Sequence, residues 1–381
     1  MAYFDQAATT YPKPECVYKA MDEFYRTCGG SAGRGDHKRA RGAGELIAET
    51  RSLIQQLLHC QNKQVVFVPT ATIALNTIIQ GVINSGAHQI YISPFEHNAV
   101  TRTLYHFCSQ NAIEVKLLAV TQNCEYDIAR IKQQFAMNKP DFVIVSHVSN
   151  TIGLVAPIEE IFLMAKEYDA VTLADMAQSA GLVECNVGLD TIDYAVFAGH
   201  KTLLGPTGIS GFVMKPHLKL KPTLYGGTGF ESANQNMPDS LPERFEIGTM
   251  NTVGIAGLNA ALKWILHMGV GSLRTAEHEK RQQLLRVISK YDFIRPVGIG
   301  SESNYVGIVS CVIDEISSDS AGPLFGELGI EVRTGLHCAP LAHKTLNTYP
   351  AGTIRFSVNY FTTDEDFEQL DAALMQIEDN L

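Results

Sequence analysis

The chain reads Tyr194-Ala195-Val196-Phe197-Ala198-Gly199-His200-Lys201-Thr202-Leu203-Leu204-Gly205-Pro206-Thr207-Gly208 where an apolar run passes directly into a glycine-rich turn. The run Tyr194–Ala198 is short, apolar and β-prone, so it predicts a buried strand. In open α/β sheets, ligands bind beyond the ends of such strands, where Lys201 stands. A buried lysine loses much of its preference for the ammonium form, so Lys201 is a candidate aldehyde-binding amine. The alternative is a surface lysine that follows a strand.

Short apolar runs separated by helical periodicity extend across residues 44–215. Besides Tyr194–Ala198, the runs that predict strands are 65–68, 90–92, 142–145 and 171–174. This alternation is typical of a mainly parallel sheet covered by helices. Residues 208–214 form another apolar run, which follows the Lys201 turn without an intervening helix. That strand is therefore a candidate for antiparallel pairing.

The end of the chain is organised differently, which indicates a smaller α+β domain. Its predicted elements are helices over 255–267, over 276–290 and near 323–328, and strands over 306–313 and 353–358. We expect a large domain over 15–250 and a small domain made of 1–14 and 251–381. Residues 225–251 hold six glycines or prolines and show little periodicity. They favour a functional or interface loop, with a mobile surface loop as the alternative.

The composition is that of an ordinary soluble globular protein of about two or three domains. Of the 381 residues, 45% are apolar and 18% are charged. The formal net charge of -10 argues against a nucleic-acid or membrane-surface partner, because both favour a basic patch. The first residues lack the pattern of a signal peptide, and no apolar run is long enough to span a bilayer. We therefore expect a cytoplasmic protein.

The eight cysteines are scattered, at positions 16, 28, 60, 108, 124, 185, 311 and 338. No Cys-x-x-Cys pair occurs, so the sequence predicts neither a zinc site nor a disulfide framework, and we expect no metal. Most of these thiols are expected to be small buried apolar groups. A cysteine with a chemical role has to be identified from its neighbours.

Polar residues suited to a pyridoxal phosphate site follow the other predicted strands. The carboxylate of Asp175 suits a pyridine nitrogen, with a helix cap as the alternative, and the imidazole of His97 suits a ring face, with a structural role as the alternative. Thr70-Ala71-Thr72 opens a predicted helix, where a phosphate and simple N-capping are both natural. Asn150 suits a ring oxygen, although such asparagines usually bind the backbone. One crevice at the strand ends would gather all of them with Lys201.

Several motifs resemble the class V pyridoxal-phosphate enzymes, nearly end to end. They are Asp175-x-x-Gln178, Gly199-His200-Lys201 and the contexts of His97, Asn150 and Arg355. Within that class the chain looks most like the cysteine desulfurases, because Arg333-Thr334-Gly335-Leu336-His337-Cys338-Ala339-Pro340 is similar to the Arg-x-Gly-x-His-Cys-Ala pattern of one branch. The resemblance implies an α/β fold of the fold type I of pyridoxal-phosphate-dependent transferases. Such a fold has a mainly parallel seven-stranded sheet in the large domain and a smaller α+β domain.

The resemblance also implies a cofactor, pyridoxal 5'-phosphate, and a role for each matched residue. Lys201 would form the Schiff base, Asp175 would bind the ring nitrogen, and His97 would stack on the ring and take part in catalysis. Gln178 and Asn150 would contact the ring oxygen. The phosphate would be bound by Thr70, Ala71, Thr72 and His200. Thr249, in the stretch 245–251, matches a residue that reaches the phosphate of the neighbouring subunit. A homodimer with its active site at the interface is therefore implied.

Two arginines are implied on the substrate side. Arg355 matches the arginine that grips the substrate carboxylate, a task that suits a bidentate guanidinium. Arg333 and Asn150 are expected beside it.

The chain departs from the family pattern at two places around the expected phosphate. Relatives usually carry serine or threonine where Ala198 stands, so one hydroxyl is missing. The phosphate loop reads Pro69-Thr70-Ala71-Thr72, whereas relatives more often place glycine near Thr70 and a hydroxyl or small residue at Ala71. We therefore entertain weaker cofactor retention, for which Thr70 compensates in part.

As a desulfurase, the protein would convert L-cysteine to L-alanine. Lys201 would remove the Cα proton, and the Cys338 thiolate would attack the substrate sulfur, leaving a persulfide for a sulfur-acceptor protein. Arg333 and His337 flank Cys338 in the sequence, and positive charge near a thiol lowers its pKa, although a histidine that is adjacent in sequence need not adjoin the thiol in space. The alternative for Cys338 is an inert buried cysteine.

Two other functions stay open on the sequence alone. The first is a cofactor-dependent enzyme in which Cys338 has no role, such as a cystine or selenocysteine β-lyase or a class V aminotransferase. The second is a degenerate, non-catalytic scaffold that binds a sulfur-accepting partner, which the missing hydroxyl at Ala198 motivates.

Overall fold

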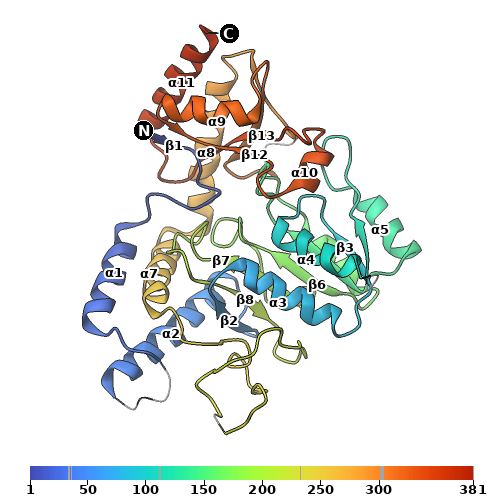
Figure 1. The fold of residues 1–381 in the computed structure, drawn as a ribbon, viewed down its shortest axis with the longest axis vertical. Coiled ribbons are helices and arrows are strands. Elements are labelled where there is room, and N and C mark those ends of the chain that lie inside the picture. The colour runs from blue at the N-terminus through green and yellow to red at the C-terminus, as the bar shows by residue number, and fades with distance from the viewer. Residues whose placement is uncertain (33–34, 36, 111–112, 232, 301–303, 381) are drawn as a thin grey trace.

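The fold is seen in a computed structural model that describes residues 1–32, 35, 37–110, 113–231, 233–300 and 304–380. Figure 1 shows a large domain around an open sheet and a smaller domain that carries both chain ends. The helices of the large domain are α1 (Glu15–Thr27), α2 (Lys38–Leu57), α3 (Ala71–Ile83), α4 (Asn98–Cys108), α5 (Ile128–Met137), α6 (Ile158–Lys166) and α7 (Thr252–Met268). The later helices are α8 (Val270–Ile288), α9 (Ser318–Glu327), α10 (Pro340–Thr345) and α11 (Asp364–Glu378).

The large domain is built on a seven-stranded sheet in the order β2-β8-β7-β6-β5-β3-β4. Its strands are β2 (Gln64–Val68), β3 (Gln89–Ile92), β4 (Glu114–Leu117), β5 (Phe142–Ser146), β6 (Val171–Asp175), β7 (Tyr194–Ala198) and β8 (Ser210–Met214). Only β8 runs antiparallel to its neighbours in this sheet. The connection from β7 to β8 is too short for the helical crossover that parallel pairing needs. The predicted mainly parallel α/β fold is confirmed, and the candidate antiparallel strand is found.

Strand β4 is the member of this sheet that the apolar runs did not predict. It lies at the sheet edge and pairs only with β3. Glu114 and Leu117 are exposed, so β4 lacks the continuous apolar run of a central strand.

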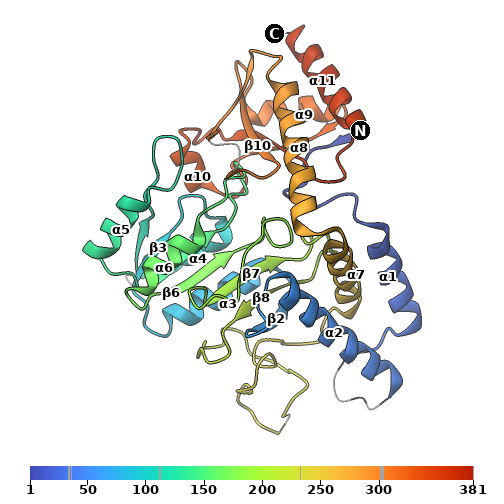
Figure 2. The same cartoon turned by 180° about the vertical axis from the view of Figure 1, so that it is seen from behind.

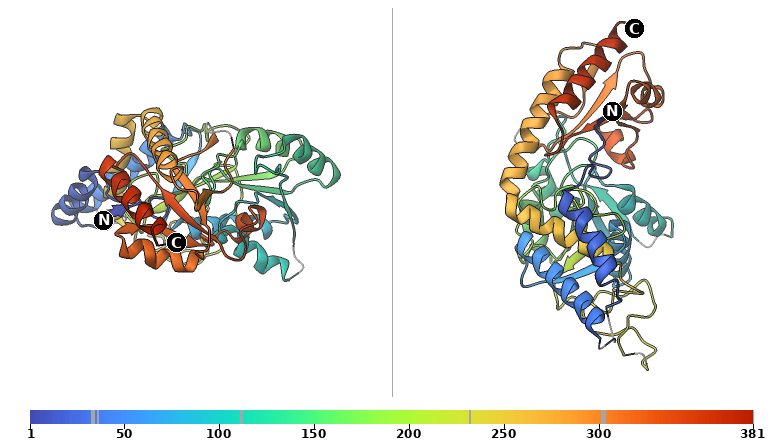
Figure 3. Two further views of the ribbon diagram at one scale, coloured as in Figure 1. Left: turned by 90° about the horizontal axis from the view of Figure 1, so that it is seen from above. Right: turned by 90° about the vertical axis from the view of Figure 1, so that its left-hand side faces the viewer.

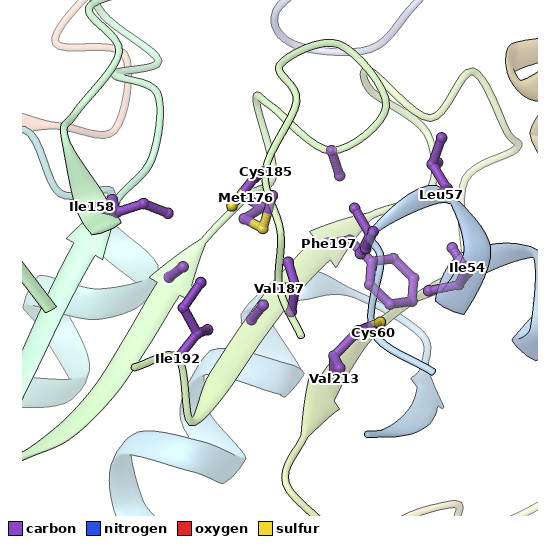
Figure 4. Close-up of a cluster of buried hydrophobic side chains, with 14 of the residues drawn as sticks. Ile54, Leu57, Cys60, Ile158, Met176, Cys185, Val187, Ile192, Phe197 and Val213 are labelled. Atoms are coloured by element: carbon purple, nitrogen blue, oxygen red, sulfur yellow. The ribbon is translucent and has the colours of Figure 1, made fainter. Parts of the chain in front are cut away.

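Helices cover both faces of the sheet (Figures 1 and 2). Helices α3 and α4 pack against one face in a core that includes Ile78 and Val100. Helices α2, α5, α6 and α7 pack in the other core, part of which Figure 4 shows, with Ile54 and Leu57 of α2 beside Phe197 of β7. Burial on both faces holds the strands in place, and with them the strand ends that carry the site.

The small domain is built on a four-stranded antiparallel sheet in the order β12-β13-β10-β9. Its strands are β9 (Ile294–Pro296), β10 (Ile308–Ile313), β12 (Arg333–Gly335) and β13 (Thr353–Ser357). The first strand of the chain, β1 (Ala2–Tyr3), pairs in parallel with β11 (Ile330–Glu331). Figure 3 shows this N-terminal segment beside the C-terminal elements. Phe4 is part of the small-domain core, so the first residues belong to that domain.

Helix α7 packs in the core of the large domain. Ile255, Leu262 and Ile265 are buried in the same core as α2. The chain then bends by 84° between α7 and α8, at Gly269 with φ of 81°. We propose that the small domain starts at α8, because only the far end of that helix packs into the small-domain core. No single helix of the described residues has the length and apolar composition that crossing a membrane requires, although α7 and α8 pass that test as a bent pair.

Candidate active site

One cavity of about 310 Å³ lies at the carboxyl ends of the parallel strands. With the exception of Thr249, every residue that the sequence assigned to the site lines it: Thr70, Ala71, Thr72, His97, Asn150, Asp175, Gln178, His200, Lys201, Arg333, Cys338 and Arg355. They follow β2, β3, β5, β6 and β7 or come from the small domain. The carboxyl ends of parallel strands meet at one sheet edge, and the small domain closes over that edge.

Lys201 is held in the turn after β7. Its carbonyl oxygen accepts hydrogen bonds from the Thr10 hydroxyl at 2.8 Å and from the Leu204 N–H at 2.8 Å. Burial lowers the pKa of the Lys201 amine to about 8, an effect that the nearby Asp175 opposes and Arg355 and Arg333 reinforce. A substantial fraction of the amine is therefore neutral near physiological pH.

Asp175 ends β6 at the floor of the cavity. Its Oδ1 accepts the Ala177 N–H at 2.9 Å, and no helix follows directly, so the bond caps a turn rather than a helix. Burial raises the pKa of Asp175, while the Ala177 N–H and the charge of Lys201 lower it. The two strand ends thus present an acid and an amine to the same space.

His97 has a structural role as well as a place in the cavity. Its Nδ1 accepts the Ala99 N–H at 3.0 Å and caps α4. Burial, together with Lys201 and Arg102, lowers the pKa of His97 to about 4. The ring is therefore neutral, and because Nδ1 is an acceptor, Nε2 carries the proton.

The N-terminus of α3 forms one wall of the cavity. The Thr70 hydroxyl accepts the Ile73 N–H at 3.2 Å, so the N-capping role of Thr70 is realised. The first-turn N–H groups of Ala71 and Thr72 have no partner inside a helix and remain available to an anion. Across the cavity, burial lowers the pKa of His200 to about 4, and its Nδ1 is buried without a hydrogen-bond partner in the described part of the chain.

The amides of Gln178 and Asn150 are anchored by the protein itself. Gln178 donates from Nε2 to the Ala7 carbonyl oxygen at 2.7 Å, and Asn150 donates from Nδ2 to the His337 carbonyl oxygen at 2.7 Å. Both side chains line the cavity, and their predicted contact with a ring oxygen stays a prediction.

Cys338 is exposed and sits on a strained turn. His337 and Cys338 have φ of 47° and 57°, left-handed values that are uncommon for residues other than glycine. The Cys338 carbonyl oxygen accepts the Asn98 N–H at 2.6 Å, which fixes the turn to the start of α4. Cys338 is thus not buried, unlike the cysteine of the alternative interpretation.

His337 does not bring positive charge to Cys338. The His337 ring is buried, and its Nε2 shares a hydrogen bond of 2.8 Å with the Thr353 hydroxyl. Burial and the neighbouring Arg355 lower the pKa of His337 to about 2, so the ring is neutral. Arg333, which lines the same cavity, is the cation of the motif that stays near the thiol.

Besides the strand-end cavity, Cys338 borders two outer grooves. It lines a groove of about 940 Å³ with Tyr105, Cys108 and Leu341, and a smaller one of about 400 Å³ between α3 and α4. The thiol therefore stands where the strand-end cavity meets two outer grooves.

Thr249 lies elsewhere on the chain. It is exposed in the irregular segment after β8 and lines a separate pocket with Gly208 and Tyr225. Its predicted reach into a neighbouring subunit stays a prediction.

Glu96 is a buried carboxyl group behind the site that sequence reasoning missed. It is fully buried, and its Oε1 accepts the Ser146 N–H at 2.5 Å while Oε2 shares a hydrogen bond of 2.8 Å with the Ser146 hydroxyl. Burial, and then the charge of Asp175, raise the pKa of Glu96 to about 8. Ser146 pairs with Asp175 across β5 and β6, so Glu96 is linked to the strand end that carries Asp175. Its place directly before His97 was the available signal.

No group of three or more His, Cys, Asp or Glu among the described residues could hold a metal ion. The reactive and binding groups that the cavity presents are an amine, N–H donors suited to an anion, a buried acid and a thiol.

Comparison with known proteins agrees with this geometry. A probable cysteine desulfurase of Methanothermobacter thermautotrophicus is 28% identical over 98% of the chain and 94% of the relative, and one of Vibrio cholerae is 29% identical over 100% and 94%. The apo structure of a cysteine desulfurase from Thermococcus onnurineus superimposes with a TM-score of 0.92 at 26% identity, covering 100% of this chain and 95% of that one. The family model described as Aminotransferase class-V matches residues 2–370. The protein therefore belongs to the aminotransferase class-V family.

Proposed function

We propose that the protein is a pyridoxal-phosphate-dependent cysteine desulfurase, which converts L-cysteine to L-alanine and takes the sulfur onto Cys338 as a persulfide. The observation that carries the proposal is that one cavity joins Lys201, Asp175 and the exposed thiol of Cys338. The relatives named as cysteine desulfurases support it.

The residues of the cavity fit pyridoxal phosphate. The orphaned Nδ1 of His200 and the first-turn N–H groups of α3, at Ala71 and Thr72, offer donors to a phosphate. The buried Asp175 suits a protonated ring nitrogen, and the neutral ring of His97 suits stacking on the face. Lys201 supplies the amine for the aldehyde.

When bound, pyridoxal phosphate withdraws electrons from Cα of the amino acid. Asp175 keeps the proton on the ring nitrogen, which maintains that withdrawal. The Lys201 amine takes the Cα proton, because burial lowers its pKa to about 8 and leaves it partly neutral. Arg355 holds the substrate carboxylate in place.

The Cys338 thiolate then attacks the substrate sulfur. A bond forms between the two sulfur atoms, the bond from Cβ to sulfur breaks, and the electron pair stays with the three-carbon fragment. Protonation at Cβ gives alanine, so the balance is cysteine plus enzyme thiol to alanine plus enzyme persulfide. Exposure of Cys338 suits the later transfer of that sulfur to an acceptor protein.

Product analysis tests this function. The purified protein, supplied with pyridoxal phosphate, L-cysteine and a reductant, is expected to form alanine and sulfide in equal amounts. Pyruvate and ammonia in place of alanine would identify a β-lyase, and 3-mercaptopyruvate formed with an amino acceptor would identify an aminotransferase. Either result, or no turnover at all, would overturn the proposal.

We further propose a homodimer whose active sites receive Thr249 from the partner subunit. The irregular segment that carries it exposes Leu224, Tyr225 and Phe230 by 52%, 75% and 45%. Exposed apolar side chains that gather in one segment favour an interface.

A thiol that must stay reduced also favours the cytoplasm as the site of action.

Ala198→Ser is expected to tighten cofactor binding. Ala198 lines the cavity beside His200, and a hydroxyl there would donate one further hydrogen bond to a phosphate. Hydrogen bonds to charged groups contribute about 1.5–3 kcal/mol, so the dissociation constant of pyridoxal phosphate is expected to fall by about tenfold to a hundredfold. Absorbance titration of the apo protein measures it. Ala198→Gly serves as the control without a hydroxyl, and an unchanged constant in the serine variant would contradict the prediction.

A further inference from the structure

Two arginines lie side by side on neighbouring strands of the small-domain sheet. Arg333 of β12 and Arg355 of β13 are direct partners in the antiparallel register, and both line the cavity. Directly opposite residues project from the same face of a sheet, and like charges in that position repel. An anion is needed between them.

Asp5 supplies this anion from the other end of the chain. Its Oδ1 accepts from Nη2 of Arg355 at 2.8 Å, and its Oδ2 accepts from Nε of Arg333 at 3.1 Å. The carboxylate is fixed in place because Asp5 bridges to Ser357 of β13, whose N–H donates to the Phe4 carbonyl oxygen at 2.7 Å. Asp5 thus sets the orientation of both guanidinium groups.

Arg355 is left with one open nitrogen. Its Nη2 donates to Asp5, and its Nη1 donates to the Asn150 carbonyl oxygen at 2.9 Å. Its Nε is buried and has no hydrogen-bond partner within the described residues, and water cannot replace that partner freely because the side chain is only 2% exposed. A buried donor without an acceptor is costly, so an incoming anion that reaches Nε would remove that cost.

We propose that Asp5 is a positioning residue for substrate recognition, which turns the Nε edge of Arg355 toward the cavity to receive the α-carboxylate of an amino acid. The inference rests on the proposed function and adds a residue to it. Asp5 and Asn150 each take one N–H of a terminal nitrogen, so the carboxylate binds along the side of the guanidinium, through the Nε N–H and a remaining terminal N–H. Asp5 also offsets one of the two arginine charges, and the substrate carboxylate offsets the other.

Ligand titration of the cofactor-loaded protein tests the role of Asp5. The change in cofactor absorbance is followed with L-alanine and with ethylamine, which has the amine but no carboxylate. Asp5→Asn keeps the size of the side chain and cannot hold both arginines. We expect it to weaken L-alanine binding about tenfold and to leave ethylamine binding unchanged. With L-cysteine, KM is expected to rise about tenfold while kcat changes less than about twofold.

Asp314→Asn is the matched control, because Asp314 forms an exposed ion pair of 2.7 Å with Arg295 in the same domain. Equal loss of L-alanine and ethylamine binding in Asp5→Asn would mean a structural defect and overturn the inference. Unchanged or tighter L-alanine binding would also overturn it, since Asp5 would then be neutral or a competitor of the substrate. A wild-type protein that neither responds to L-alanine nor forms it from L-cysteine would instead contradict the proposed function.

Discussion

Cys338→Ala is expected to lower alanine formation from L-cysteine by at least about a hundredfold, because no other thiol of the described residues lines the strand-end cavity. The substitution removes the sulfur nucleophile and leaves the amine, acid and arginines in place. Cofactor absorbance and its response to L-alanine should therefore stay as in the wild type. The measurement is the initial rate of alanine release, with reductant present.

Mass spectrometry of the intact protein gives a second readout of the same variant. After L-cysteine is added without reductant, the wild type should gain one sulfur atom on the peptide that contains Cys338, and the variant should gain none. Cys108→Ala is the control, because Cys108 lines the outer groove beside Cys338 but not the cavity. Undiminished alanine formation in Cys338→Ala would rule out the desulfurase mechanism.

Lys201→Ala is expected to reduce turnover about a thousandfold or more, since it removes both the covalent anchor of the cofactor and the base at Cα. In the wild type, borohydride reduction should fix pyridoxal phosphate on the Lys201 peptide. In the variant, no lysine should be labelled. Peptide mapping after reduction measures this directly, independently of activity.

Lys13→Ala is the matched control for Lys201. Burial lowers the pKa of Lys13 to about 8 as well, and its Nζ donates to the Thr10 carbonyl oxygen at 3.0 Å, yet it does not line the cavity. We expect it to keep the label and the turnover. A labelled lysine in Lys201→Ala, or the loss of the label in Lys13→Ala alone, would show that Lys201 does not form the Schiff base.

The strand-end residues could be predicted from the sequence because parallel strands bring their carboxyl ends to one edge. Asp175, His97 and Lys201 each follow an apolar run, so locating the runs also located the site. Strand β4 could not be found in this way, since an edge strand does not need a continuous apolar run. Helix α7 lies within the range predicted for the small domain but packs in the large-domain core, and its sequence does not reveal this because an apolar helix face fits either core.

Two features of the site depend on contacts that chain order does not reveal. Asp5 meets Arg355 across 350 positions of sequence, and no local pattern marks a short N-terminal segment as part of a carboxylate site. His337 adjoins Cys338 in the chain, but two successive left-handed residues send their side chains to different surroundings, one buried and one exposed. The adjacency of His337 and Cys338 in the sequence therefore does not place an imidazolium beside the thiol.

The position of Cys338 between the strand-end cavity and the outer grooves has a kinetic consequence under the proposed function. The amino acid and the sulfur acceptor approach the thiol from different sides, so they never need to be bound together. The order is then a double displacement, in which alanine leaves before the acceptor reacts. Reciprocal plots of rate against cysteine at several acceptor concentrations should accordingly be parallel lines, and between the two half-reactions the protein itself is the sulfur store.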